Sequence, residues 1–340
     1  MMPQVSALML AWSVFGVCAV LIAIAGSTLC RDADIIAEKL NLGRNWVGLV
    51  LLATVTSLPE LATGISSVTI ARAPEIAVGD IFGSCVFNLL LLVLVDFLYR
   101  ETPVFRTVSQ GHLLTAGFGI VMIAFAGLSV TLNNVDLAFS IWHVGLSTPI
   151  LIALYLLSAR TLFIYERARD VSPGSALLYA SHDLGRSVRR ALMAAVVVAV
   201  AGIALPFSGT AIAAGMGWEE GFVGTLFIAL TTSLPEVAIT VTAVRLRAPD
   251  LAFANLLGSN LFNLAILAVD DIFYTRGPLL HDISAAHIGT ALTAVLMTGV
   301  VVIGLVFGPE RRLFRTLNWI SLALVTMYVF NVAIISRYAG

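Results

Sequence analysis

The pentapeptide Thr-Ser-Leu-Pro-Glu occurs twice in this chain, at residues 56–60 and 232–236, each time inside a long apolar segment. A proline removes a backbone donor and breaks a helix, and a carboxylate is costly at membrane depth. Packing does not explain why both occur together at matching places in two halves of one chain. We therefore predict two broken helices, each carrying a buried functional glutamate.

The composition is that of a membrane protein. Of 340 residues, 59% are hydrophobic and 11% are charged, whereas soluble domains carry about 25% charged residues. This predicts an all-α integral membrane protein in contact with the lipid bilayer. The net charge of −1 gives no reason to expect a nucleic-acid partner. The three cysteines lie in or beside apolar segments, which argues against a disulfide framework, and the apolar N-terminal segment is interpreted as a first span rather than a signal peptide.

Ten segments are long and apolar enough to be interpreted as membrane spans, which need roughly 20 residues each. They cover residues 7–29, 46–71, 75–99, 111–132, 139–159, 191–214, 221–245, 250–274, 285–307 and 316–336. An arginine-rich linker, residues 160–190, separates the first five from the second five. We predict a first five-helix repeat over residues 1–159 and a second over residues 191–340.

The basic residues of the connecting loops predict the orientation, because cytoplasmic loops carry the excess of lysine and arginine. With ten spans, one set of alternate loops holds sixteen of the nineteen basic residues, including the linker. The other set holds Arg72, Arg276 and Arg337. The linker is thus predicted to be cytoplasmic, and both termini extracytoplasmic, in a multi-pass protein of the cell (plasma or inner) membrane.

The repeat extends beyond the pentapeptide. Residues 53–60 match 229–236, and residues 79–88 match 254–263, within motifs that cover 46–99 and 221–274. Since each half has an odd number of spans, the second copy must enter the membrane from the opposite side. This is an inverted repeat, an architecture that places the transport site between the halves near the midplane.

The repeated residues supply hard oxygen ligands. The breaks at Pro59 and Pro235 are expected to free backbone carbonyls near Val55 and Thr231, and those of Ala53 and Ala229 if the helix unwinds. Calcium takes 6–8 oxygen ligands in flexible geometry, and two glutamates would neutralise one divalent cation. Candidate ligands are the side chains of Glu60, Glu236, Thr56, Ser57, Thr232, Ser233, Ser84, Asn88, Ser259 and Asn263 and the carbonyls of Ala53 and Ala229. Asp80 is either a further ion or proton position or a salt-bridge partner near the membrane surface. Asp96, Asp270 and Asp271 lie at span ends and are predicted to be interfacial.

These residues resemble the two alpha repeats of the sodium/calcium exchanger family, within the cation/calcium exchanger superfamily. The resemblance covers about 40 residues in each repeat. It implies that Glu60 and Glu236 are the central cation ligands and that the hydroxyl, amide and carbonyl groups above complete calcium and sodium positions. It also implies alternating access, with the first and sixth spans sliding against a bundle that holds the sites.

The sequence departs from the family pattern in a few places. Val55 and Thr231 stand where the motif has glycine, and Asn263 stands where many sodium/calcium exchangers carry aspartate. In the first repeat, Asp80 and Cys85 both stand where asparagine is usual. One carboxylate is therefore missing from the expected centre, and another is present further along the same helix.

The functional prediction is an antiporter, not an enzyme, that exchanges calcium for sodium and uses no cofactor besides the transported ions. Calcium/proton exchange remains open, with Glu60, Glu236 or Asp80 taking the proton. A cation channel is a further alternative, although an inverted repeat with two broken helices favours a carrier. An intramembrane hydrolase would need a nucleophile or metal constellation that the sequence does not offer. We expect a monomer or a weak homo-oligomer.

Overall fold

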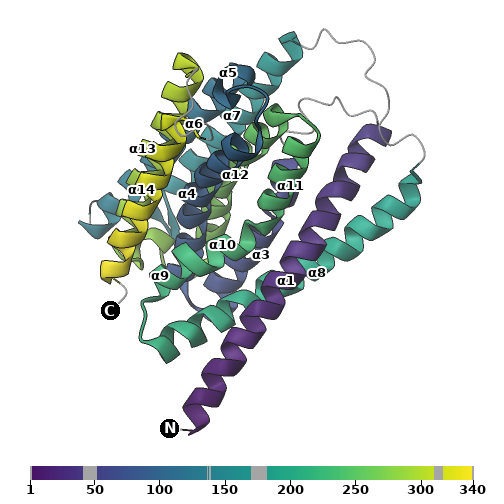
Figure 1. Cartoon of the computed structure of the whole chain (residues 1–340). Helices are drawn as coiled ribbons and strands as arrows, with labels where there is room; N and C mark the ends of the chain where they lie inside the picture. Colours follow the sequence, from purple (N-terminus) through teal and green to yellow (C-terminus); the bar gives the residue numbers. More distant parts are fainter. Residues whose placement is uncertain are drawn as a thin grey trace.

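The computed structural model describes residues 2–40, 52–135, 137, 139–169, 182–309 and 317–338. Nearly all of this part of the chain is helical (Figure 1). The first half holds α1 (Met2–Lys39), a helical stretch over 52–56, α3 (Leu58–Ser66), the π-helix η1 (Ser67–Ala71), α4 (Pro74–Leu98), α5 (Val104–Thr107), α6 (Gly111–Asn134) and α7 (Ser147–Arg169). The second half holds α8 (Leu184–Met216), α9 (Glu220–Val223), the π-helix η2 (Gly224–Ile228), α10 (Ala229–Thr232), α11 (Leu234–Arg245), α12 (Pro249–Phe273), η3 (Leu279–His281), α13 (Ala286–Phe307), α14 (Trp319–Ile335) and η4 (Ser336–Tyr338).

Seven helices are long and apolar enough to cross a membrane, or up to eight if the bent pair 220–232 and 234–245 forms one span. These criteria apply to the described residues and do not reach the predicted ten. Helix α14 has 17 residues and is shorter than the criterion. Part of the predicted second span, residues 46–51, lies outside the described residues. The all-helical membrane architecture is confirmed, whereas the count of ten is not.

The fifth predicted span was placed too early. Residues 140–145 form a short antiparallel hairpin of β1 (Ser140–Ile141) and β2 (Val144–Gly145), and α7 begins only at Ser147. The turn contains Trp142 at φ 60°, a left-handed conformation that ends regular structure. Helices also extend beyond their predicted ends: α1 continues to Lys39, α7 continues to Arg169, and α8 begins at Leu184. The predicted linker is therefore helical at both ends.

Equivalent sequence signals begin α4 and α12. Pro74 and Pro249 occupy the first helical position, where the missing N–H costs nothing and the fixed φ favours the helix. Two residues earlier, Arg72 and Arg247 adopt left-handed φ values of 59° and 56°. Such residues commonly end the preceding helix. The same turn therefore separates the broken helix from the next helix in both halves.

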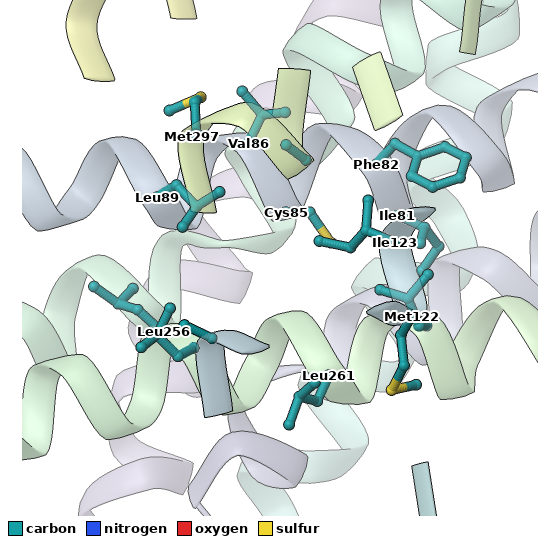
Figure 2. Close-up of a cluster of buried hydrophobic side chains, with 14 of the residues drawn as sticks. Ile81, Phe82, Cys85, Val86, Leu89, Met122, Ile123, Leu256, Leu261 and Met297 are labelled. Carbon is teal, nitrogen blue, oxygen red and sulfur yellow. The ribbon is translucent and has the colours of Figure 1, made fainter. Parts of the chain in front are cut away.

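The main core is built around α4 and α12, which pack against each other and against α6 and α13. Figure 2 shows part of it, with side chains from four helices: Ile81, Phe82, Cys85, Val86 and Leu89 of α4, Met122 and Ile123 of α6, Leu256 and Leu261 of α12, and Met297 of α13. Phe82 and Phe253 are fully buried. These two helices therefore hold a fixed position relative to their neighbours.

Helices α1 and α8 form a separate pair, seen as the two long inclined helices in Figure 1. They make their most extensive contacts with each other. Asp32 of α1 is buried and lies 3.3 Å from Nε of Arg190 on α8. Their outer faces expose apolar side chains that suit contact with lipid, among them Met9, Val17, Ile24, Leu192, Val196 and Val200.

The repeat also appears in tertiary contacts. Asp96 of α4 accepts hydrogen bonds from Asn318 N and Ser321 Oγ at the start of α14. Its counterpart Asp271 accepts from Gly145 N and the Thr148 hydroxyl at the start of α7. In each half, the end of the third predicted span thus holds the beginning of the fifth predicted span of the other half.

A second duplicated contact lies at the opposite ends of the same two helices. Glu75 of α4 accepts from Ser284 N at 2.5 Å and lies 2.7 Å from Nε2 of His287. Asp250 of α12 accepts from Ser109 N at 2.6 Å and lies 3.0 Å from Nε2 of His112. The serine and the histidine keep the same spacing in both halves. The two repeats are therefore equivalent in contacts as well as in sequence.

Candidate cation-binding site

Both repeated pentapeptides break their helices at the serine. Residues 52–56 and α10 are helical, Ser57 and Ser233 form turns, and α3 and α11 begin at the following leucine with proline in the first helical turn. In the second repeat, the two helical pieces are bent by 43°. A π-helix lies next to each broken helix, η1 after α3 and η2 before α10. Irregular backbone at membrane depth is tolerated where it lines a site.

Thr56 and Thr232 make equivalent contacts with the opposite repeat. The Thr56 hydroxyl lies 3.1 Å from Ser259 Oγ and donates to Asn255 Oδ1 at 3.4 Å. The Thr232 hydroxyl lies 3.5 Å from Ser84 Oγ and donates to Asp80 Oδ1 at 2.8 Å. Since Asn255 is the repeat counterpart of Asp80, the two breaks contact α12 and α4 through equivalent residues.

Ser233 connects the first glutamate to α4. Its hydroxyl lies 3.3 Å from Glu60 Oε1 and 3.1 Å from Ser84 Oγ, and Ser84 donates to Asp80 Oδ1 at 3.4 Å. A hydroxyl has one proton to donate, so Ser233 donates to only one of these two neighbours at a time. This network brings together residues that are far apart in the sequence.

Several carboxylate oxygens of the cluster have no hydrogen-bond partner. Glu60, Asp80 and Glu236 are all fully buried. Glu60 Oε2, Asp80 Oδ2 and both oxygens of Glu236 are without a partner, although the Thr56 and Ser259 hydroxyls lie beside Glu236. No basic side chain pairs with these carboxylates among the ion pairs of the described residues. The cluster therefore has more acceptor oxygens than protons to donate to them.

The carbonyls of Ala53 and Ala229 were predicted to be exposed if the helix unwinds, and in this structure both are hydrogen-bonded. Ala53 O accepts from Ser57 N at 3.1 Å and from the Thr56 hydroxyl at 3.0 Å. Ala229 O accepts from Ser233 N at 3.1 Å and from the Thr232 hydroxyl at 3.2 Å. The serine that ends each helix still completes its last turn. Either carbonyl can face a cation in this geometry only if the threonine hydroxyl turns away.

The remaining predicted ligands occupy the crossing of α4 and α12. Asn88 donates to Asn260 Oδ1 at 3.1 Å, and its own Oδ1 has no partner. The side chain of Asn263 is fully buried, and neither its Oδ1 nor its Nδ2 has a hydrogen-bond partner. The Ser57 hydroxyl is also buried and without a partner. Asn260 donates to Cys85 O at 3.1 Å. The structure thus places Ser57, Asn88 and Asn263 in the interior, where they offer unpaired oxygens.

Asp80 belongs to the interior network. It is fully buried and accepts from Thr232 and Ser84, which argues against a place at the membrane surface. No group of three or more His, Cys, Asp or Glu side chains converges on one metal position in the described part of the chain.

Sequence reasoning missed Asn255 and Asn260, which contact the predicted ligands directly. Both lie inside the repeated motif, and the alignment of Asn255 with Asp80 was a usable signal. Sequence reasoning also interpreted Asp96, Asp270 and Asp271 as interfacial from their positions in the chain and did not predict that all three side chains are buried within the protein. Their position near a predicted span end gave no indication of this.

A cavity of about 220 Å³ lies at the N-terminal end of α4, where Glu75, Glu219, Thr225 and His287 line it. Asp80 lies further along the same helix. Gly79 lets α4 approach the π-helix closely, because an added Cβ would be 2.9 Å from Thr225 N. The cavity places acidic side chains beside the helix that carries Asp80 and Ser84.

Comparison with known proteins agrees with this geometry. Residues 10–164 and 190–337 match the family described as sodium/calcium exchanger protein. The chain belongs to the sodium/calcium exchanger protein family. This member of the family is 26% identical over 314 residues to CaxA of Alkalimonas amylolytica, named as a candidate antiporter, and the match covers 88% of this chain and 91% of CaxA.

Two solved structures share the fold. The sodium-calcium exchanger NCX_Mj, soaked with sodium and strontium, superposes with a TM-score of 0.64 at 18% identity, over 96% of this chain and 99% of NCX_Mj. The H⁺/Ca²⁺ exchanger CAX superposes with a TM-score of 0.71 at 16% identity, over 96% of this chain and 85% of CAX. At 16–18% sequence identity, these superpositions establish a shared fold.

Proposed function

We propose that this protein is a secondary active antiporter that exchanges calcium for sodium across the membrane by alternating access. The observation that carries the proposal is the cluster around Glu60 and Glu236, in which buried carboxylate oxygens lack hydrogen-bond partners. An unpaired buried charge costs several kcal/mol. A bound cation removes this cost and takes the oxygen ligands that calcium and sodium prefer.

The transport mechanism follows from the two breaks. Glu60 and Glu236 lie on separate broken helices, and their neighbours Ser233 and Thr56 contact the opposite repeat. Calcium and sodium would compete for these oxygens, so one must leave before the other binds. Helices α1 and α8, which pack chiefly on each other, would slide against the remaining bundle and expose the site to either face in turn.

We infer further that ten spans form two inverted repeats, with both termini extracytoplasmic and the linker cytoplasmic. The duplicated contacts of Asp96 and Asp271 support this, and so do those of Glu75 and Asp250. In both pairs, a residue of one half bonds a segment of the other half, and its repeat counterpart makes the equivalent bond in the reverse direction. The five-helix units 1–159 and 191–340 remain predictions, as does a monomeric or weakly associated state.

The test is isotopic calcium flux in proteoliposomes with the membrane potential clamped. An outward or inward sodium gradient is expected to drive flux in wild type. Glu60→Gln and Glu236→Gln should each abolish it, while Glu101→Gln, a change at a glutamate paired with Arg247 outside the site, should leave it unchanged. Normal transport by both site variants would refute the site assignment, and flux that needs no counter-ion would indicate a channel.

Calcium/proton exchange is a second candidate because of Asp80. It adds a third buried carboxylate to the cluster, where the other repeat has the neutral Asn255. The fold likeness to the H⁺/Ca²⁺ exchanger CAX is compatible with it. The same liposomes decide between the candidates: a proton gradient without sodium would then drive calcium flux, and Asp80→Asn would remove that coupling.

A further inference from the structure

Asp270, near the end of α12, is a buried carboxylate that the cation cluster does not use. Its side chain is fully buried, and neither Oδ1 nor Oδ2 has a hydrogen-bond partner. The next residue, Asp271, is different, since it accepts bonds from the starts of α7 and η3. Asp270 therefore caps no helix and holds no loop, and a structural role does not account for it.

The structure makes room for this carboxylate on α3. A Cβ built on Gly64 would lie 2.6 Å from Oδ1 of Asp270 and 2.7 Å from its Cγ. The other repeat has Thr240 in place of Gly64 and Val95 in place of Asp270. A glycine facing a buried carboxylate thus occurs in one half only. The symmetry of the repeat therefore does not explain Gly64 and Asp270.

The position of Gly64 connects Asp270 to the cation cluster. Glu60, Gly64 and Ser67 are spaced by four and three residues, so they lie along one face of α3 and η1. Gly64 is ~6 Å along the helix axis from Glu60. Ser67 is fully buried and its hydroxyl is unpartnered, and η1, which carries it, contacts α12. Buried oxygens without hydrogen-bond partners therefore occur at Glu60, at Asp270 and at Ser67.

The charges that act on Asp270 are acidic. They come from Asp80 on α4 and from Asp271 on α12 itself. A charged Asp270 without a partner would be strongly unfavourable in this environment. Calcium needs 6–8 oxygen ligands, and the glycine facing this carboxylate offers no side-chain ligand, whereas a proton needs none. A proton neutralises this carboxylate best.

We propose that Asp270 is a proton-binding site of the transport cycle, which releases its proton when a divalent cation binds at Glu60 and Glu236. The proposal rests on the proposed function for the cation site. A cation at that site adds positive charge beside Asp80, one of the two carboxylates whose charge acts on Asp270, in an interior where charges are weakly screened. The proton on the Asp270 carboxyl oxygen then leaves to water, and the carboxylate that remains is stabilised by the cation.

The test counts the protons that purified protein releases into weakly buffered solution when calcium is added, with bound calcium measured on the same samples. Asp270→Asn should bind calcium but release one proton fewer per calcium than wild type. Asp270→Val, which copies the Val95 of the other repeat, provides a second variant if the asparagine variant does not fold. Asp282→Asn, a change at an exposed carboxylate in the next loop, is the matched control and should match wild type.

Infrared spectroscopy gives a second readout that does not depend on transport. The carbonyl band of a protonated carboxylic acid should be present in wild type, weaken on addition of calcium, and be absent in Asp270→Asn. Equal calcium binding with equal proton release in wild type and variant would overturn the proposal while the proposed function stands. A band that is lost in the variant but unaffected by calcium would show a permanent proton and would also overturn it. Absence of calcium binding to wild type would overturn both.

Discussion

Gly26 of α1 lies directly against the ring of Pro235: a Cβ atom built on Gly26 would be 2.5 Å from Cγ of that proline. Its repeat counterpart, Gly202 of α8, lies against the other break, with an added Cβ at 3.1 Å from Pro59 O. Each long helix thus crosses the broken helix of the opposite repeat at a glycine. Sliding of α1 and α8 against the bundle would pass through these two crossings.

Replacing Gly26 with alanine should slow transport without removing the cation site. Extra volume in a packed contact typically costs 1–3 kcal/mol, and about 1.4 kcal/mol added to a barrier slows a rate roughly tenfold. We expect sodium-driven calcium flux in Gly26→Ala to fall by about that factor, while calcium binding stays unchanged. Gly202→Ala should behave similarly. Gly16→Ala, on the same helix with open space around it, is the control, and an equal loss there would show that the crossing has no special role.

Thr232 should matter more than Thr56 for cation binding, although the two are repeat counterparts. Thr232 donates to the carboxylate of Asp80 at 2.8 Å, whereas Thr56 donates to the neutral amide of Asn255 at 3.4 Å and lies beside Glu236 without a hydrogen bond to either of its oxygens. Hydrogen bonds to charged groups contribute about 1.5–3 kcal/mol and neutral ones about 1 kcal/mol. Thr232→Val should therefore weaken calcium binding roughly tenfold and Thr56→Val by a few-fold, as measured by isotope binding. Equal losses would show that the bond from Thr232 to Asp80 contributes no more to binding than the contacts of Thr56 with Asn255 and Glu236.

The repeat made much of this site predictable from the sequence. A proline and a glutamate in an apolar segment identified both breaks, and the spacing of Ser84 and Asn88 on one helix identified the face that lies near them. The duplicated Thr-Ser-Leu-Pro-Glu also aligned the two halves, which identified the residues that correspond to each other. All of these are local patterns, which is why the sequence alone revealed them.

Other features depend on contacts that no local pattern encodes. The hairpin before α7 replaced part of a predicted span, because its residues are apolar enough to resemble a helix while Trp142 ends regular structure. Asp270 was interpreted as interfacial because it is near a span end, and only its packing on Gly64 shows that it is buried. The carbonyls of Ala53 and Ala229 were predicted to be exposed if the helix unwinds. The sequence did not show that the following threonine and serine would bond them.

Asp96 and Asp271 should each contribute to stability by holding the start of a helix. Each carboxylate accepts several hydrogen bonds in a buried position. Asparagine keeps one acceptor oxygen but loses the charge, so hydrogen bonds that contribute about 1.5–3 kcal/mol to a charged acceptor fall to about 1 kcal/mol. We expect Asp96→Asn and Asp271→Asn to lower the thermal unfolding midpoint in detergent by several degrees. Asp282→Asn, at an exposed position, should change it little, and an unchanged midpoint in both buried variants would contradict the anchoring role.

The inverted arrangement can be tested at Gln110 and Ala285, which are repeat counterparts and both exposed. Each comes two residues before the histidine that pairs with Asp250 or Glu75. If the second repeat enters the membrane from the opposite side, these positions lie on opposite faces, with Gln110 cytoplasmic and Ala285 outside. The three native cysteines are buried and can be replaced by alanine, after which Gln110→Cys and Ala285→Cys are made one at a time. In intact cells, a membrane-impermeant maleimide should label only the cysteine at 285, and after lysis it should label both. Labelling of both in intact cells would place them on one face and would refute the inverted repeat.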